Sequence, residues 1–304
     1  MTQQATVTRL ETAGKPKYAH FLGCVLPTKM PWAESAIMQA LPKAGVDIEY
    51  LTKSSCCPRA GVWVSVDKRV WLTLASYNLL QAEQAGRDVM VSCNGCYVTL
   101  YEANKLLQEN PKELEEVNKY LAAAGKHYDA SVRVRHLLEV LYEDVGIERI
   151  KKEAKKLHIR VAIHPGCHMR IFQDGHLVRY FTELNEALVD EVVPYGLERM
   201  CCGLQANLAD REFATYDRAK RKFDAIKAQN VDALVIVCSG CYDQFERAIA
   251  TLKKKDGYEF DVPVIHLAEL LAAAYGIKPD DFGMRTMRTA PVDNLIEKLE
   301  NSVK

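Results

Sequence analysis

The sequence predicts an α/β protein of two tandem copies of one unit, each a small, mostly parallel sheet flanked by helices, related by a pseudo-twofold axis. Two observations support this prediction. Short apolar runs alternate with segments of helical period, and the ten cysteines form two sets of five with nearly equal spacing. Strands that alternate with helices are typical of parallel sheets, because a parallel connection needs a crossover segment.

The bulk composition is that of an ordinary globular protein. The 304 residues include 40 acidic and 40 basic side chains, with 48% hydrophobic and 26% charged residues, which gives no sign of nucleic-acid binding or disorder. No apolar run is long enough to span a bilayer, and the first sixteen residues lack an apolar signal core. We therefore expect a cytoplasmic protein.

Each copy is predicted to have the order β-α-β-α-β-α-β-α. Helical period is clear in segments such as 68–85. The predicted strands are short β-rich runs at 18–22, 46–51, 89–92 and 132–135 in the first copy, and at 160–164, 191–194, 233–237 and 262–265 in the second.

The repeat also predicts the domain organisation. A first domain is expected over 17–150, a second over 155–278 and a C-terminal tail over 279–304, with the boundary in the charged stretch 148–158. The first copy carries extra residues around 110–128, which we interpret as an inserted surface helix. In the tail, Val292, Leu295, Ile296 and Leu299 share one helical face, which either covers the core or docks a partner.

The cysteines repeat in detail. The spacing is C-x31-CC-x35-C-x2-C in the first copy and C-x33-CC-x35-C-x2-C in the second. We call these the first thiol set (Cys24, Cys56, Cys57, Cys93, Cys96) and the second thiol set (Cys167, Cys201, Cys202, Cys238, Cys241). Every group of cysteines follows the carboxyl end of a predicted strand, the edge where open α/β sheets build their sites.

The spacing favours iron–sulfur ligation. Disulfides are rare in the cytosol, and a Cys-x-x-Cys pair alone fits zinc, iron–sulfur or redox chemistry. A structural zinc ion takes four ligands, so five cysteines per copy leave one surplus thiol, whereas a multi-iron cluster can use all five. Structural zinc sites and buried or disulfide-bonded cysteines remain the alternatives. Near helix amino termini, thiolates are stabilised by the helix dipole.

Two pairs of residues accompany the Cys-x-x-Cys turns. Gly95 and Gly240 stand inside the turns, where we expect a special backbone conformation or a close approach. Tyr97 and Tyr242 follow the turns and are interpreted as packing residues rather than proton donors.

Four histidines lie near the predicted edge of the thiols. His136 and His266 begin the last helix of each copy and either cap it or tune a cluster. His164 and His168 flank Cys167 and have no counterparts in the first copy, which leaves a role at one site open.

Two arginines are candidates for substrate binding. Arg59 and Arg170 lie close to cysteines, one in each copy. They either bind an acidic substrate or are ordinary surface charges.

The doubled cysteine motif resembles the cysteine-rich CCG domain family. The chain from about Tyr18 to Gly276 is similar to the B subunit of heterodisulfide reductases, and the stretches "FLGCVLPTKMP" and "CCPRAGVWVSVDKRVWLTLA" look more like that family than like its lactate or glycolate oxidase relatives. The first copy departs from the pattern, because Pro58 stands where the second copy has Gly203. Since proline lacks an N–H that could face sulfide, the two clusters could differ in potential or ligand access.

The resemblance implies a cofactor and a reaction. It implies that each thiol set binds one non-cubane [4Fe-4S] cluster and that the chain cleaves or forms a disulfide in two one-electron steps. The implied substrate is either the coenzyme M–coenzyme B heterodisulfide or carrier-bound sulfur in a sulfur-oxidising pathway. The alternative is an electron-transfer subunit of a multi-subunit oxidoreductase without its own substrate site.

The resemblance also implies partners. They are a ferredoxin-like [4Fe-4S] subunit and a flavin-bearing subunit of the same complex. The chain itself has no G-x-G-x-x-G fingerprint, Walker A loop or C-x2-C-x2-C ferredoxin motif. Its electrons are therefore expected to come from other subunits.

Overall fold

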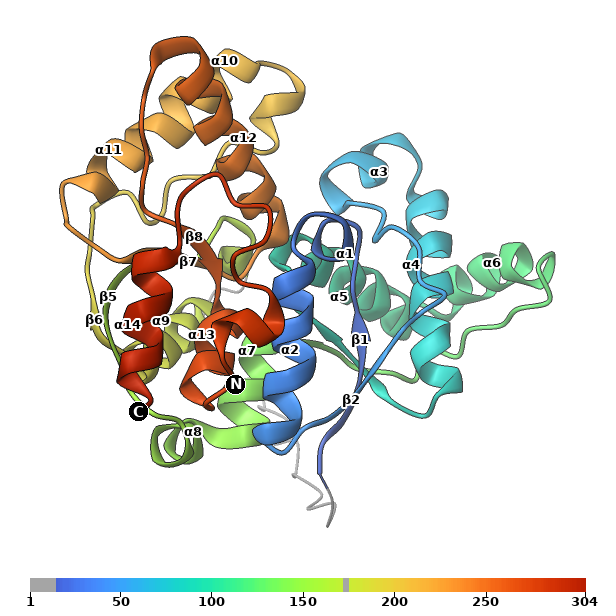
Figure 1. Ribbon diagram of the computed structural model, residues 1–304. Coiled ribbons are helices and arrows are strands. Elements are labelled where there is room, and N and C mark those ends of the chain that lie inside the picture. The colour runs from blue at the N-terminus through green and yellow to red at the C-terminus, as the bar shows by residue number, and fades with distance from the viewer. Residues whose placement is uncertain (1–14, 172–174) are drawn as a thin grey trace, which may run out of the picture.

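The computed structural model describes residues 15–171 and 175–304 and contains two parallel sheets of the same topology (Figure 1). The first sheet has the order β2-β1-β3-β4 and the second the order β6-β5-β7-β8. Their strands are β1 (Lys17–Phe21), β2 (Asp47–Tyr50), β3 (Asp88–Val91), β4 (Val134–His136), β5 (Leu157–His164), β6 (Val189–Val192), β7 (Ala233–Ile236) and β8 (Val264–His266). The predicted fold class is confirmed, with strand ends shifted by one to three residues at most positions.

Helices connect the strands and cover the sheets. In the first copy these are α1 (Val25–Lys29), α2 (Pro31–Lys43), α3 (Ala60–Val66), α4 (Lys68–Gln84), α5 (Asn94–Glu109), α6 (Pro111–Ala122), α7 (Leu137–Glu139), the π-helical turn η1 (Val140–Gly146) and α8 (Ile147–Glu153). In the second they are η2 (His168–Ile171), α9 (His176–Leu188), η3 (Ala206–Leu208), α10 (Arg211–Phe213), η4 (Ala214–Lys220), α11 (Arg221–Lys227), α12 (Ser239–Asp256) and α13 (Leu267–Ala274).

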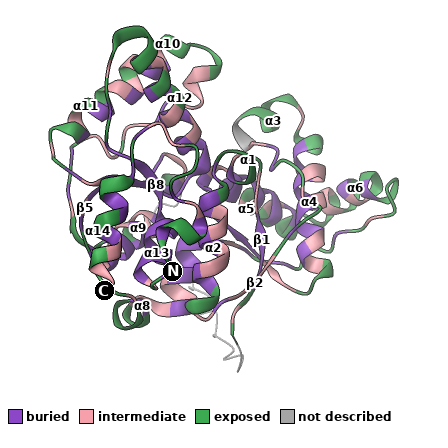
Figure 2. Cartoon of the chain, viewed as in Figure 1, coloured by how far each residue is buried: buried purple, intermediate pink, exposed green. Residues whose placement is uncertain are grey.

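One inner strand of each sheet, β3 in the first copy and β7 in the second, is apolar over most or all of its length and is buried on both faces. Val89, Met90 and Val91 of β3 are fully buried, as are all four residues of β7, Ala233–Ile236. Strands buried on both faces read as continuous apolar runs instead of alternating ones, which is why these segments are recognisable in the sequence. Figure 2 shows this buried layer running through both copies.

The two copies pack against each other through two equivalent pairs of helices. Helix α2 of the first copy contacts α13 of the second, and α9 of the second contacts α7 of the first. Helices α2 and α9 follow the first strand of their copies, whereas α7 and α13 follow the last. Such reciprocal contact is the arrangement that a twofold relation between two like units produces. It brings the carboxyl edges of the two sheets to one side of the molecule.

Three further segments complete the fold. The residues inserted in the first copy form α6, as predicted. The charged stretch 148–158 is no open linker, because its first half lies within α8 and its second half enters β5. The tail forms η5 (Pro279–Phe282) and α14 (Asp293–Ser302), which packs on β5.

The apolar face of α14 covers the core, so the docking interpretation of this face is not needed. Val292, Leu295, Ile296 and Leu299 are at most 5% exposed. Within the described ranges, no helix is both long and apolar enough to cross a membrane. The first fourteen residues, for which no signal segment is expected, lie outside the described part of the chain.

Candidate metal centre

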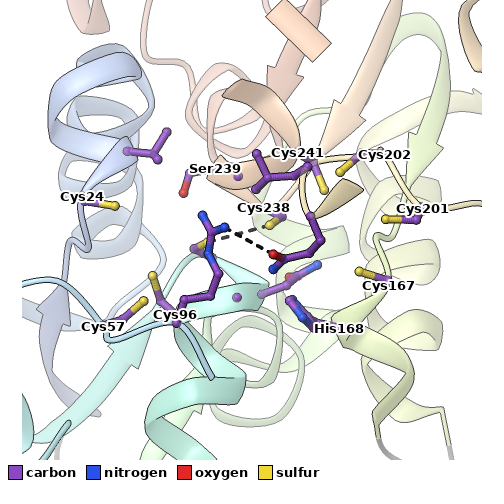
Figure 3. Close-up of a pocket in the computed structure, with 18 of the residues that line it drawn as sticks. Cys24, Cys57, Cys96, Cys167, His168, Cys201, Cys202, Cys238, Ser239 and Cys241 are labelled. Atoms are coloured by element: carbon purple, nitrogen blue, oxygen red, sulfur yellow. Dashed lines mark hydrogen bonds between the residues drawn. The ribbon is translucent and has the colours of Figure 1, made fainter. Parts of the chain in front are cut away.

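All ten cysteines line one pocket between the two copies. The space between them is about 740 Å³, which includes solvent-open space at the mouth. Figure 3 shows Cys24, Cys57 and Cys96 on one side of this pocket and Cys167 and Cys201 on the other. All ten are free thiols, so the disulfide alternative does not describe this structure. The strand order predicts the position, because β1 and β3 are neighbours whose connections leave in opposite directions, and sites form at such a switch point.

Side-chain interactions connect the ten sulfurs into a continuous row. The row runs through Cys24, Cys56, Cys57, Cys96, Cys93, Cys238, Cys241, Cys202, Cys201 and Cys167. At its centre, the Sγ atoms of Cys93 and Cys238 lie 3.8 Å apart. These two residues are each other's counterparts in the repeat. A residue that contacts its own counterpart lies beside a twofold axis, which places the pseudo-twofold axis between Cys93 and Cys238.

The thiols do not all ionise together without a cation. The pKa of Cys57 is lowered to about 5, mainly by a hydrogen bond from Cys56. The pKa of Cys201 is lowered to about 2 by Cys167 and Cys202, whereas that of Cys202 is raised to about 12 by its bond to Cys201. Neighbouring thiolates oppose each other's ionisation. Positive metal centres among the sulfurs would remove this conflict, so the donor set fits a metal cofactor.

The spacing of the sulfurs argues against a single tetrahedral ion in each copy. Zinc–sulfur bonds of about 2.3 Å place the four sulfurs of a tetrahedral site about 3.8 Å apart. In the described residues, the one group of three or more metal-binding side chains within 4.8 Å of one another is His164 with Cys202 and Cys241. The five thiols of either set are thus more spread out than one ion requires. This spread fits a cofactor of several metal ions.

Helix starts hold four of the sulfurs. Cys93 and Cys238 are the N-cap residues of α5 and α12, and Cys96 and Cys241 lie in the first turns of the same helices. The unpaired N–H groups and the dipole at a helix amino terminus favour negative charge. The Cys-x-Gly-Cys turn therefore places two sulfurs where a thiolate is stabilised.

The two histidines at the ends of β4 and β8 are helix caps, which confirms the capping interpretation. Nδ1 of His136 accepts a hydrogen bond from the N–H of Leu138 at 3.1 Å, while Glu139 bonds back to the N–H of His136, and His266 and Glu269 repeat this capping box. Burial lowers the pKa of both histidines to about 4, so their rings are neutral.

The other ring nitrogen of each histidine contributes to the contact between the copies, that of His266 directly and that of His136 through Asn94 of its own copy. With Nδ1 accepting a bond, Nε2 carries the proton and donates it. His136 Nε2 donates to Oδ1 of Asn94 at 3.0 Å, and the amide of Asn94 donates to the carbonyl of Pro165 at 2.8 Å. His266 Nε2 donates to the carbonyl of Ser92 at 3.1 Å. Asn94 and His266 therefore connect the copies directly beneath the thiol row.

Of the residues that accompany the two Cys-x-x-Cys turns, both tyrosines and one of the two glycines match expectation. Tyr97 and Tyr242 are buried and pack against aromatic neighbours, outside the pocket lining, which confirms a packing role. At Gly240, a Cβ atom would lie 2.7 Å from Cδ2 of Leu204, so the expected close approach is present and a side chain there would require Leu204 to move. The same expectation is wrong for Gly95, where a Cβ atom would face the pocket with ordinary contacts of 3.7 Å or more.

The structure separates the two arginine candidates. Arg59 lines the pocket at its mouth, where its guanidinium donates to Oε1 of Gln205 at 3.4 Å across the two copies. Arg170 is exposed and does not line the pocket. The substrate-binding interpretation is therefore kept for Arg59, and the surface-charge interpretation applies to Arg170.

The two histidines around Cys167 also differ in their position relative to the pocket. His168 lines the pocket and faces Gly95 of the first copy. His164 is buried at the end of β5, behind Cys202 and Cys241, and burial lowers its pKa to about 3.

Sequence reasoning missed three residues near the thiols. Asn94 lies inside the first Cys-x-Gly-Cys turn, but its bonds to distant residues leave no local pattern. Gln205 reaches the mouth of the pocket from the loop that follows Cys202. Lys222 is fully buried, and its one sequence signal is that the equivalent position of the first copy, twenty residues after the Cys-Cys pair, holds an uncharged Tyr77.

The chain is similar to known proteins in both sequence and fold. The family model of the cysteine-rich CCG domain matches residues 18–101 and 161–246. The B subunit of a ferredoxin/F420H2-dependent CoB-CoM heterodisulfide reductase from Methanosarcina acetivorans is 35% identical over 276 residues, 88% of this chain and 92% of that protein. A protein from Archaeoglobus profundus that is named as like the B subunit of heterodisulfide reductase is 34% identical over 297 residues, 94% of this chain and 99% of that protein.

A solved structure supports the fold independently. The crystal structure of a hypothetical protein from Helicobacter pylori matches with a TM-score of 0.73 at 16% identity, and the match covers 90% of this chain and 52% of that one. Fold and thiol pocket together define a protein of two tandem cysteine-rich CCG domains. The chain belongs to the family of heterodisulfide reductase B subunits. This membership and the cysteine-rich domains support an iron–sulfur oxidoreductase subunit.

Proposed function

We propose that the chain is the catalytic iron–sulfur subunit of a heterodisulfide reductase-type complex that cleaves or forms a disulfide or a related sulfur species. The observation that carries this proposal is that both thiol sets line one pocket with an open mouth. Two separate electron-transfer sites would have no need of a shared space. A pocket between the two sets offers a substrate access to both at once.

The ten thiols would hold two [4Fe-4S] clusters of the non-cubane type, one per thiol set. When bound, these clusters supply electrons one at a time. Cleavage of a disulfide consumes two electrons and two protons and gives two thiols: R–S–S–R′ + 2 e⁻ + 2 H⁺ → RSH + R′SH. Two one-electron centres match this balance, and the reverse reaction forms the disulfide.

The residues of the pocket would bind and orient the substrate. Val25 and Leu204 provide apolar wall on the two sides, and the guanidinium of Arg59 stands at the mouth. A planar guanidinium binds sulfonate, phosphate or carboxylate groups with paired hydrogen bonds. This chemistry accommodates either the coenzyme M–coenzyme B heterodisulfide or a sulfur species bound to a carrier. Asn94 and His266 would keep the copies at a constant separation.

The proposed partners are a ferredoxin-like [4Fe-4S] subunit and a flavin-bearing subunit of the same complex. The reason is chemical, because the pocket has thiol ligands for two clusters and the chain has no motif for a further electron carrier. Electrons must then cross from another protein.

The test is anaerobic iron and acid-labile sulfide analysis, followed by electron paramagnetic resonance (EPR) with and without candidate thiols under oxidising conditions. The proposal expects about eight iron atoms per chain from two four-iron clusters, and a paramagnetic signal that depends on the thiol. Clusters that ignore every thiol would point to the electron-transfer alternative. Zinc without sulfide would overturn the cluster assignment.

A pair of variants tests the ligands. Cys238→Ser is expected to disturb the second cluster selectively, and Cys93→Ser, its counterpart, the first. Unchanged iron, sulfide and spectra in either variant would contradict the assignment of that cysteine as a ligand.

A further inference from the structure

The two thiol sets are alike in sulfur but differ in what surrounds them. Strand pairing makes Phe21 of β1 and His164 of β5 equivalent, because they face Val91 and Ile236 at matching positions. Phe21 is an apolar side chain at 1% exposure, whereas His164 brings two ring nitrogens to the same depth at 1% exposure. Within the described chain, neither ring nitrogen of His164 makes a hydrogen bond of ordinary geometry, and the backbone of Glu198 is the hydrogen-bonding group that acts on the ring.

The ring of His164 lies beside two sulfurs of the second thiol set. One of its nitrogens lies within 4.8 Å of the Sγ atoms of both Cys202 and Cys241. A neutral imidazole carries one N–H, and an N–H aimed at a ligand sulfur stabilises negative charge there. An unpaired buried N–H is costly, so a hydrogen bond to the sulfur of a bound cluster would satisfy it.

A buried cation lies on the same side. Lys222 of α11 has no exposed surface, and its ammonium group donates to the carbonyl of Leu197 and to the hydroxyl of Tyr195 at 3.3 Å. In the described residues it forms no ion pair with a carboxylate. Its charge interacts with the sulfurs of Cys202 and Cys241 and also with the carboxylate of Glu198.

The backbone adds a third difference in the same direction. The N–H of Gly203 donates to Sγ of Cys201 at 3.4 Å, and the equivalent residue of the first copy, Pro58, has no N–H. The first set has a cation of its own in Arg59, but this side chain is partly exposed at the mouth and is bonded to Gln205. Water screens a charge there more than it screens a buried one.

From this asymmetry we infer that the second site, which His164, Lys222 and Gly203 surround, holds an added electron more tightly than the first. Added positive charge and hydrogen bonds to the sulfurs raise the reduction potential of an iron–sulfur site. The inference rests on the proposed function, because it requires a cluster at each thiol set. It gives the two sites an order: at equilibrium, the first electron received from a partner resides in the second copy.

The experiment is an anaerobic potentiometric titration of the iron-loaded chain, followed by EPR, in the wild type and in two variants. His164→Phe installs the residue that the first copy uses, and Lys222→Met removes the buried charge at similar length. Cys24→Ser and Cys167→Ser, which each remove one end of the thiol row, assign the two redox transitions to their copies. Lys220→Met is the matched control, because it removes a more exposed lysine from the neighbouring turn.

We expect the second-copy transition to lie at the higher potential in the wild type. In His164→Phe and in Lys222→Met, the equilibrium constant for one-electron reduction of the second-copy site should fall about tenfold. For one electron, this is a shift of the reduction potential by about 59 mV to more negative values. The first-copy transition and Lys220→Met should remain at the wild-type values. If Lys222→Met fails to load iron, His164→Phe decides.

The inference is overturned if the second-copy transition is the lower one, or if fully loaded variants titrate as the wild type does. Iron and sulfide analysis of the same samples separates this failure from failure of the proposed function. A wild-type chain with two four-iron clusters and the opposite order refutes the inference alone. A wild-type chain without iron and sulfide refutes both.

Discussion

Asn94 offers the sharpest test of how the two copies are held together. Its side chain is 2% exposed and makes two hydrogen bonds to distant segments, one from Nε2 of His136 and one to the carbonyl of Pro165. Asn94→Ala leaves a buried N–H and a buried carbonyl without partners. Each such group costs about 1–3 kcal/mol, so the free energy of unfolding should fall by about 2–6 kcal/mol.

The matched control is Asn185→Ala. Asn185 is also fully buried, but its amide donates to the carbonyl of Phe181 within α9, a bond between neighbours in one helix. We expect this variant to lose about 1 kcal/mol for that bond. The measurement is guanidinium denaturation of the iron-free, reduced chain, followed by tryptophan fluorescence. If Asn94→Ala costs no more than Asn185→Ala, the bonds between the copies do not have the role assigned to them here.

Three further predictions concern the loops, the pH dependence and the mouth of the pocket. Gly203→Ala should lower stability by about 2 kcal/mol or more, measured by thermal unfolding, because φ is +99° and a Cβ atom would lie 2.9 Å from the carbonyl oxygen of Ala214. Lowering the pH from about 6.5 towards 4 should reduce the free energy of unfolding by up to about 3 kcal/mol for each capping histidine. Each histidine has a pKa of about 4 in the folded chain and about 6.5 in the unfolded chain, so the unfolded chain binds a proton first as the pH falls. Replacing either histidine by asparagine, itself a helix cap, should remove its share of that slope in urea denaturation between pH 7 and 5. Arg59→Gln should raise KM for an anionic sulfur substrate about tenfold or more, whereas Arg170→Gln should leave it unchanged in steady-state assays of the complex.

Much of the fold was predictable from the sequence because its signals are local. Buried parallel strands correspond to short apolar runs in the sequence, and a duplicated unit repeats the spacing of its cysteines. Since every cysteine group follows a strand, the common edge of the thiols follows from the parallel arrangement without knowledge of any contact. The capping role of His136 and His266 was also readable, because a cap is an interaction between residues that are close in the chain.

Other features depend on residues that are far apart in the sequence. The contact of Cys93 with Cys238, the bond of Arg59 to Gln205 and the link from Asn94 to Pro165 all cross between the copies. Which glycine meets a neighbour is likewise a matter of packing, so Gly240 matched the expectation and Gly95 did not. The residue pattern within one copy carries no information on how that copy packs against the other.

The sequence alone determined the repeat, the α/β class and the residue types available for chemistry, because these depend on periodicity and spacing. The tertiary structure decided that both thiol sets face one pocket, and that His164 and Lys222 lie behind the second set only. The electrostatic surroundings of a site are summed over every element that packs around it. That sum is set by the three-dimensional arrangement of distant residues.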